Sequence, residues 1–597
     1  MKLKLGLLAG TLAMFAHGVV IDIESGDVTA LTNALSQYKT SDHTIQLAKG
    51  DYDLSGIQME EDGSEFGKTH LVVSGVKIVG MGESREDVRL IGDGTCRVYR
   101  MIKDTYARLQ NLTITNGYAK FVEGVANSGH GGGIYGYPTV TNCVITGCRA
   151  DKNGGGAYGY TYIRVCDILN NSAGGAGGGA FKPNYVINSL VRGNHASSDG
   201  GGIHGDGIGS ASDTDVIENT SGGTGGGISK VQTVTNCIIA LNTSVHGGGG
   251  LYASPGTTRF AYDCTICSNK STGAEYTASG AVYGYNTFRG KVFDNYARHG
   301  GGASYAILTD VEIYNNYAIG YGGGVYNSTA TNCVIRDNFH GTGGNSYGSV
   351  LYGCDISGTG VNGGRAVNCE FHDIINGSVL TNHPFISNTS WSGHVYCNTP
   401  VCTNCLFRNN IIPDYSYTMF CGVNDPKRSG FLVNCTVVSN KYGRTFGYMA
   451  SETYPVYVKN CVFVWNQGHD TTAFRDIHSW EYVSSNGLRF ANCAYGTATG
   501  RFAAGQISDL ADSSDGPMYK FGTDRFPSDP GFAFKDAVHP FEPKRTSALR
   551  GLGAVENWMA DATDIRGDGF PRLRDGIVDI GCYQCWIMPI GTVLSIR

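Results

Sequence analysis

The sequence predicts an all-β fold, a right-handed parallel β-helix of about 23 residues per turn with an N-terminal helical cap and a C-terminal capping module. Two observations predict it. Gly-Gly-Gly recurs at intervals of about 23 residues through the middle of the chain, and a Cys-x4-Asn pattern runs in step with it. Short β-branched segments lie between these markers, and no helical period is sustained. Such short repeats are typical of a solenoid whose turns pair at about 4.8 Å.

The composition excludes several other classes of protein. Of the 597 residues, 88 are Gly and 15 are Pro, without the Gly-X-Y period of collagen. Hydrophobic residues make up 41% of the chain and aromatic residues 11%, which excludes a disordered tail. The net charge of −6 lacks the basic footprint of a nucleic-acid-binding protein. We therefore interpret the glycine as architectural, with one cluster per turn marking a bend.

The N-terminus reads as an export signal. Lys2 and Lys4 precede an apolar segment, and Ala16-His17-Gly18 follows it as a small-x-small cleavage site. We expect cleavage after Gly18, or else after Ala16. No later segment contains 18 consecutive apolar residues, so we expect no transmembrane segment in the mature chain. The protein is then expected to be exported, either extracellular or at the cell surface in association with the outer membrane.

The rest of the chain is expected to form a cap, a solenoid and a C-terminal capping region. Asp27 is placed to cap a helix in which Ala30, Leu31, Ala34 and Leu35 share one apolar face. This helix would cover the exposed edge of the first turn. The expected parts are a signal peptide in residues 1–18, the cap and first strands in 19–60, the parallel β-helix in 61–495 and a C-terminal capping region in 496–597.

Equivalent residues of successive turns are expected to stack in columns. A cysteine column would form a ladder of small buried side chains, and asparagines suit the bends because they tolerate positive φ and their amides bond to the amides above and below. The expected ladder comprises Cys143, Cys166, Cys237, Cys264, Cys333, Cys405, Cys435 and Cys461.

The chain holds 19 cysteines, an odd number, so all of them cannot pair. Three Cys-x-x-Cys pairs occur, but Cys264 and Cys405 already belong to the ladder, so we expect no metal site there. In an exported protein Cys582 or Cys585 could form a disulfide, but the sequence does not determine which cysteines pair.

Two segments carry resemblances to known families. Asn332-Cys333-Val-Ile-Arg-Asp-Asn338 and its companion repeats resemble those of bacterial polymorphic outer-membrane proteins, and more broadly secreted β-helix proteins that share the pectate lyase fold. The resemblance implies a fold rather than an activity. Near the C-terminus, a second segment resembles the choice-of-anchor Q module, which implies a closing cap before a surface anchor. Its motifs are Asp529-Pro530-Gly531-Phe532, Ser547-Ala548, Asp564-x-x-Gly567 with Pro571-Arg572, and Asp579-Ile-Gly-Cys582-Tyr-Gln584. Cys582 and Gln584 depart from that module's usual Ala and Glu.

Two groups of residues are candidates for function. Asp199, His204 and Asp206 form a cluster for acid–base chemistry, with His204 and Asp206 expected on the same side of a strand. Scattered polar residues are the plainer interpretation. A tyrosine stripe for stacking on sugar rings is the second candidate, with an ordinary aromatic ladder as its alternative. The stripe comprises Tyr135, Tyr137, Tyr158, Tyr160, Tyr283, Tyr285 and Tyr326.

Two functions follow from this arrangement. The first is a non-enzymatic surface for adhesion, or for binding glycans or partner proteins, because the repeats are uniform and no strong acid–base constellation is present. The alternative is a carbohydrate-active enzyme, a polysaccharide lyase or glycoside hydrolase. We expect no cofactor, no metal, no nucleic-acid partner and a monomeric chain, with a polysaccharide or surface glycan as the expected partner.

Overall fold

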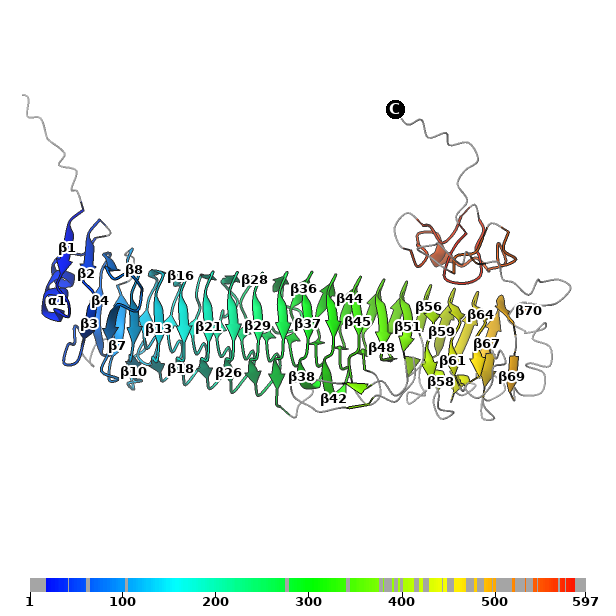
Figure 1. The fold of residues 1–597 in the computed structure, drawn as a ribbon, viewed down its shortest axis with the longest axis horizontal. Helices are drawn as coiled ribbons and strands as arrows, with labels where there is room; N and C mark the ends of the chain where they lie inside the picture. Colours follow the sequence, from blue (N-terminus) through cyan, green and yellow to red (C-terminus); the bar gives the residue numbers. More distant parts are fainter. Residues whose placement is uncertain are drawn as a thin grey trace, which may run out of the picture. The chain divides into compact units, whose positions relative to one another are not determined.

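The protein was studied as a computed structural model, drawn in Figure 1. It divides into two compact units, Met1–His195 and Ala196–Arg597, which are treated separately below. The predicted signal peptide falls almost wholly in residues 1–17, outside the described residues. The structure describes residues 18–40, 42–60, 65–102, 106–273, 279–339, 344–374, 379–380, 389–390, 396–397, 401–412, 418–421, 429–442, 444–447, 456–468, 477–479, 488–496, 498–500, 518–520, 532, 541–544, 546–566, 570–574 and 576–585.

The predicted cap helix is confirmed as α1, Val28–Gln37. The Asp27 carboxylate accepts a hydrogen bond from the Ala30 amide at 2.8 Å, which satisfies one of the free amides of the first turn. Leu31, Ala34 and Leu35 are buried. Among the described residues, no helix combines the length and the apolar character needed to cross a membrane.

In the first unit, parallel strands of successive turns stack into four columns, as expected for a parallel β-helix (Figure 1). From Thr139 onward the register repeats, pairing Thr139 with Tyr162 and Tyr162 with Tyr185. The first column is β1 (Val20–Ile23), β2 (Thr44–Leu47), β5 (Lys77–Gly80), β8 (Arg108–Gln110), β12 (Thr139–Thr141), β16 (Tyr162–Arg164) and β20 (Tyr185–Ile187); the second is β3 (Gly50–Asp53), β6 (Val88–Ile91), β9 (Thr113–Thr115), β13 (Val144–Thr146), β17 (Asp167–Leu169) and β21 (Leu190–Arg192). The third is β4 (Thr69–Val73), β7 (Arg97–Met101), β11 (Ile134–Tyr135), β15 (Ala157–Tyr158) and β19 (Ala180–Phe181); the fourth is β10 (Tyr118–Ala119), β14 (Arg149–Ala150) and β18 (Ser172–Ala173).

The second unit continues the same pattern of parallel pairing. Its columns include β24 (Ser210–Ser212) to β67 (Leu488–Ala491), β25 (Asp215–Ile217) to β70 (Met518–Lys520), and β23 (Ile203–His204) to β69 (Ala498–Gly500). The repeat length changes along this unit, since Asn404 stacks on Asn368 from 36 residues further along the chain. The turn between these two residues is therefore longer than the average of about 23 residues.

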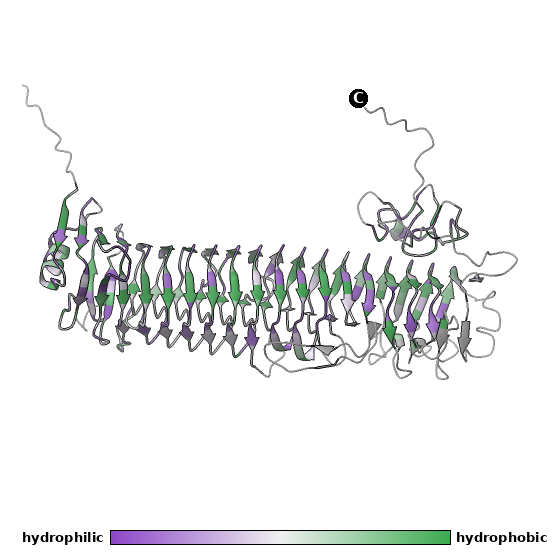
Figure 2. Cartoon of the chain, viewed as in Figure 1, coloured by the Kyte–Doolittle hydropathy of each residue, from purple (hydrophilic) through white to green (hydrophobic). Residues whose placement is uncertain are grey.

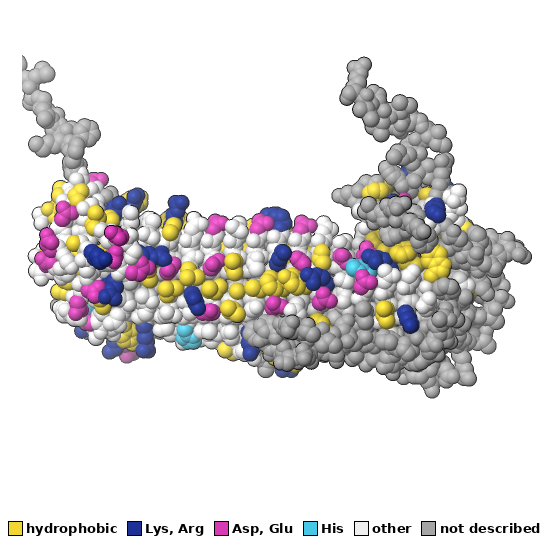
Figure 3. Space-filling view, viewed as in Figure 1, with side chains coloured by type: hydrophobic (Ala, Val, Ile, Leu, Met, Phe, Trp, Pro, Cys, Tyr) yellow, Lys and Arg dark blue, Asp and Glu magenta, His cyan; other side chains and the backbone are white. Residues whose placement is uncertain are grey.

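The strands bury a narrow apolar interior. Figure 2 shows hydrophobic residues concentrated in three of the columns, while the strands of the short fourth column are largely polar. Some apolar side chains also face outward. In the second unit Figure 3 shows hydrophobic side chains over the strands from β29 (Ile238–Ala240) to β45 (Val334–Arg336), where Ile238 is 47% and Val334 37% exposed.

The glycine triplets form a tight bend at which turns approach closely. Gly154 has φ +72°, a left-handed conformation, and a Cβ there would lie 2.5 Å from the Ala157 carbonyl oxygen. A Cβ on Gly155 would lie 2.4 Å from the carbonyl oxygen of Ser172. Only glycine fits both the backbone angle and the spacing.

Cysteine and asparagine columns line the interior. The eight cysteines of the expected ladder are all buried, and the amide of Cys435 lies 3.4 Å from the Cys461 sulfur. None of the 17 cysteines whose side chains the structure describes forms a disulfide, Cys582 and Cys585 included. The asparagine before the cysteine adopts positive φ, as in Asn236 at 50°. The asparagine after it forms a buried amide ladder, in which Asn242 donates to the Asn269 side-chain oxygen at 3.0 Å. Both roles expected of asparagine are thus confirmed.

The C-terminal residues of the second unit pack onto the turns of that unit. The Cys582 amide donates to the Thr436 hydroxyl at 3.0 Å, and the Gly581 amide donates to the Asn460 carbonyl at 2.8 Å. A shared apolar cluster joins the two parts, comprising Leu406, Val438, Val462, Val464, Ala494, Phe532, Phe541, Leu549, Ile580, Cys582 and Tyr583.

Buried carboxylates hold this C-terminal segment together. Asp579 accepts hydrogen bonds from the Gly551 amide at 2.8 Å and the Cys585 amide at 2.6 Å. Burial raises the pKa of Asp579, which these bonds partly offset. Asp564 accepts a hydrogen bond from the Gln584 backbone amide at 2.9 Å. The motif residues quoted for this region are therefore structural, whereas Asp529, Pro530, Gly531 and Gly567 lie outside the described residues.

Candidate functional site

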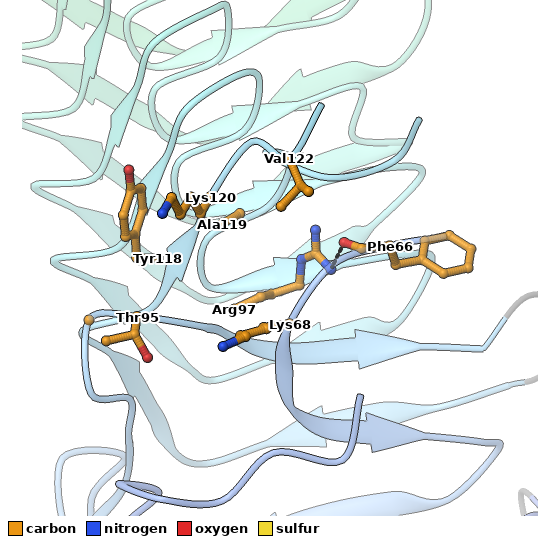
Figure 4. A pocket seen from close by; sticks show the side chains of 9 residues that line it. Phe66, Lys68, Thr95, Arg97, Tyr118, Ala119, Lys120 and Val122 are labelled. Carbon is orange, nitrogen blue, oxygen red and sulfur yellow. Dashed lines mark hydrogen bonds between the residues drawn. The ribbon is translucent and has the colours of Figure 1, made fainter. Parts of the chain in front are cut away.

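A cavity of about 380 Å³ opens among the loops of the first turns of the first unit (Figure 4). Loops before β4 and β7 form one part of its wall, and β10 with the loop after it forms the other. Among the described residues, the lining contains three cationic side chains and no carboxylate. It comprises Phe66, Lys68, Gly94, Thr95, Arg97, Tyr118, Ala119, Lys120 and Val122.

Arg97 forms the base of this cavity and is 1% exposed. Its guanidinium donates to the carbonyl oxygens of His130 at 2.6 Å, Gly131 at 3.0 Å and Phe66 at 3.2 Å, and to the Thr69 hydroxyl at 3.2 Å. Burial lowers the pKa of Arg97 to about 10, so the group stays charged at neutral pH. Because these partners are neutral dipoles, the positive charge beneath the cavity is not cancelled by them.

The described carboxylates near the cavity are hydrogen-bonded to other residues, and Asp93 bonds to Thr95 of the lining. Glu60 accepts two hydrogen bonds from Arg100, at 2.6 and 2.8 Å. Asp151 accepts a hydrogen bond from the Tyr118 hydroxyl at 2.7 Å, and this bond raises the pKa of Tyr118. In Figure 4 the Lys120 side chain points toward Tyr118, and the Lys68 side chain runs below Arg97 toward Thr95. The cavity is therefore suited to an anion.

The predicted acid–base cluster is not assembled. β23 ends at His204, which is buried, whereas Asp206 lies in the following turn at φ 52° and is exposed. The expectation that both project from one side of a strand is wrong, because the strand has already ended. The Asp199 carboxylate accepts hydrogen bonds from the Thr224 hydroxyl at 2.8 Å and from the Lys230 ammonium at 3.2 Å, so it links neighbouring turns.

The inner tyrosines stack on one another. Tyr135 stacks on Tyr158 with ring centroids 5.1 Å apart, and Tyr158 on Phe181 at 5.2 Å, with interplanar angles of 16° and 2°. Ring faces covered in this way are not open to a sugar. Tyr137 and Tyr160, 38% and 42% exposed, form a separate pair with ring centroids 5.4 Å apart.

The tyrosines of the second unit lie deeper. Tyr283 and Tyr326 are buried, and burial raises the pKa of each to about 12. Tyr285 is fully buried, and its hydroxyl donates to the Val231 carbonyl at 2.6 Å. These three candidates are corrected to core residues, because neither ring face nor hydroxyl is presented to a ligand.

A charged group on the outer face of the second unit links β48 (Asp355–Gly358) to β51 (Glu370–Ile374). His372 donates to Asp355 at 2.6 Å and to Asp373 at 2.7 Å. The hydrogen bond to Asp355 raises the pKa of His372 to about 9, with Asp373 adding to the effect and burial opposing it. His372 is therefore an imidazolium that ties two turns together at neutral pH.

The contacts of His372 with Asp355 and Asp373 predict that the stability of the second unit depends on pH. The pKa of His372 in the folded protein, about 9, exceeds the ordinary histidine value, so the stabilisation by these contacts is complete below about pH 6.5 and is lost as the pH rises through 9. The carboxylates of Asp355 and Asp373 are about half exposed, so we expect a loss of only about 1–2 kcal/mol. Urea unfolding of wild type and His372→Gln from about pH 6 to 10 measures it. Equal pH dependence in both proteins would contradict the assignment.

Sequence reasoning missed the cavity residues because they precede the regular repeats. One signal was available: Arg97 is a charged residue in a strand whose neighbouring positions Val98 and Tyr99 are apolar and buried. The same region also brings together three side chains of metal-ligand type, His70, Asp93 and Cys96.

The chain was compared with known proteins. No family model and no curated protein matches it, so the resemblances to polymorphic outer-membrane repeats and to the choice-of-anchor module are unsupported. Among solved structures it is similar to the PL6 family alginate lyase AlyGC (10% identity, TM-score 0.29, covering 81% of this chain and 86% of that one). It is also similar to pectate lyase Pel9A (10% identity, TM-score 0.25, 95% and 96%) and to the catalytic domain of a GH87 α-1,3-glucanase (11% identity, TM-score 0.20, 84% and 67%). At these scores the fold assignment rests on the strand pairing described above.

Proposed function

We propose that this protein binds an acidic polysaccharide, with one carboxylated sugar residue held in the cavity of the first unit. The observation that carries the proposal is the lining itself, which places Lys68, Arg97 and Lys120 around one space without a carboxylate. Adhesion to a cell surface has no support in the structure and is not part of the proposal.

The chemistry of the wall favours a sugar carboxylate. The ammonium groups of Lys68 and Lys120 form charge-assisted hydrogen bonds with a carboxylate, which are stronger than bonds between neutral groups. Arg97 adds its positive charge from beneath, because its N–H groups already donate to loop oxygens. Tyr118 and Val122 add an aromatic and an aliphatic surface against which the C–H face of a sugar ring packs. The volume of about 380 Å³ lies within the range of small-molecule sites.

We expect binding without turnover. A lyase would need a group in the cavity that accepts a proton from the uronate ring. Tyr118 holds its proton, because its hydroxyl donates to Asp151 and its pKa is raised. Absorbance of an unsaturated uronate product, measured on the same polysaccharides, tests the alternative of an enzyme.

The binding test compares oligomers of uronic acids with neutral glucose oligomers of matched length by calorimetry. We expect the uronate oligomers to bind, and the double variant Lys68→Ala/Lys120→Ala to bind them at least ~10-fold more weakly, since each lost charge-assisted bond is worth ~1.5–3 kcal/mol. The affinity should also fall as salt is raised.

Lys49→Ala is the matched control. Lys49 lies in the same unit, is 70% exposed and pairs with Asp87 rather than facing the cavity. Its removal should leave binding unchanged. Equal binding of neutral and acidic oligomers, or an unaltered affinity in the double variant, would refute the proposal.

Such a ligand would be met outside the cell. This agrees with the export expected from Lys2 and Lys4 and the apolar segment after them, which we retain as part of the proposal.

A further inference from the structure

Three side chains of metal-ligand type converge beside the cavity of the first unit. The Nε2 or Nδ1 nitrogen of His70, a carboxylate oxygen of Asp93 and the sulfur of Cys96 all lie within 4.8 Å of one another. His70 lies on β4, while Asp93 and Cys96 belong to the segment that leads into β7 one turn later. The pairing of β4 with β7 is what brings them together.

The orientation of His70 shows which nitrogen faces the other two groups. Its Nδ1 lies 2.6 Å from the Ile57 carbonyl oxygen, which accepts hydrogen bonds only, so Nδ1 carries the proton. Metal-binding histidines commonly donate their second nitrogen to a backbone carbonyl in this way. The Nε2 lone pair is then directed at the Asp93 side.

Nε2 of His70 faces Asp93. It lies 3.1 Å from Asp93 Oδ1, and it accepts a hydrogen bond from the Asp93 amide at 3.4 Å. With the proton on Nδ1, Nε2 and Oδ1 are both acceptors directed at the same space, an arrangement that suits a metal ion. His70 itself is 1% exposed.

The carboxylate is held in place for such a role. Asp93 Oδ1 accepts hydrogen bonds from the Thr95 amide at 2.8 Å and the Thr95 hydroxyl at 2.7 Å. The Asp93 side chain is 25% exposed, which leaves a route from solvent, whereas Cys96 is buried. A thiolate, an imidazole and a carboxylate together are the donor set of zinc rather than of calcium or magnesium.

We propose that His70 Nε2, Asp93 and Cys96 bind one zinc-class transition-metal ion, with a fourth position open to water. Binding replaces the Cys96 thiol proton, which is released to solvent, by the metal. Donors around a tetrahedral zinc lie roughly 3.3–3.8 Å apart for bond lengths of about 2.0–2.3 Å. The His70 and Asp93 atoms, 3.1 Å apart, therefore separate slightly on binding, while any pair of ligand atoms as far apart as 4.8 Å draws closer. Thr95, which positions Asp93, also lines the cavity, but the metal proposal is independent of the polysaccharide proposal.

Cobalt is the probe, because a cobalt–thiolate bond gives a near-ultraviolet charge-transfer band that a carboxylate or imidazole bond does not. The full chain, stripped with a chelator, is titrated with Co²⁺ and then with Zn²⁺. We expect the band to saturate at one equivalent and to disappear when Zn²⁺ displaces the cobalt. Cys96→Ser should abolish the band, and Asp93→Asn should weaken Co²⁺ binding ~100-fold.

Cys148→Ser is the matched control, since Cys148 is a buried free thiol of the same unit. It should retain the band. Far-ultraviolet circular dichroism of each variant checks that it folds, and Asp93→Asn keeps an oxygen for the Thr95 bonds. Absence of the band in wild type, or its persistence in Cys96→Ser, overturns the proposal.

Discussion

Replacing Arg97 with methionine is expected to destabilise the first unit by roughly 3–5 kcal/mol and to abolish binding in the cavity. The guanidinium donates to carbonyl oxygens of His130, Gly131 and Phe66, which are left without that donor when a thioether takes its place. Those carbonyls belong to two loops, so the cavity loses its shape and its deepest charge together. Urea unfolding and uronate binding measure the two effects.

Two further variants separate the loss of the positive charge from the loss of the hydrogen bonds to the loops. Arg97→Lys keeps the charge without the planar fork, so it should lose stability but retain part of the binding. Arg108→Met removes an exposed arginine of the same unit and should change neither property by more than about 0.5 kcal/mol. If Arg97→Met is as stable as Arg108→Met, Arg97 does not organise the loops.

Replacing Asn316 with leucine is expected to destabilise the second unit by roughly 3–6 kcal/mol. Its amide nitrogen donates to the Val292 and Tyr314 carbonyls and to the Asn338 oxygen, each at 2.9 Å, and its oxygen accepts from Asn295. Leucine has a similar size but can make none of these bonds, and each orphaned buried group costs about 1–3 kcal/mol.

Asn286→Leu is the control for this experiment. Asn286 is a partly exposed strand residue of the same unit, outside the amide ladder. We expect it to unfold near the wild-type urea concentration. A ladder that tolerates leucine at residue 316 as well as at 286 would mean that the amide column adds little to stability.

The fold was largely predictable because a solenoid repeats its local rules. The Asp27 cap and the apolar face of α1 are short-range patterns, and the Cys and Asn markers report one turn each. The period lengthens from about 23 residues where Asn404 stacks on Asn368, because a longer loop leaves the strand pairing intact.

The candidate site was less predictable. His204 and Asp206 are close in sequence but differ in burial, because a strand end intervened. Tyr285 has the same Tyr-Gly-Tyr context as the exposed Tyr137, yet it is fully buried. Sequence spacing does not encode which side of a bend faces the interior.

By itself, the sequence determined that this chain is a parallel β-helix with a capped first turn and with interior columns of cysteine and asparagine. Each of these follows from contacts between residues about one turn apart. Only the tertiary structure decided which charged side chains lie close together. Lys68, Arg97 and Lys120 share one cavity, and His70 reaches Asp93, because strands and loops of different turns lie side by side. No periodicity in the sequence marks these residues, since each occurs once and is defined by its neighbours in space.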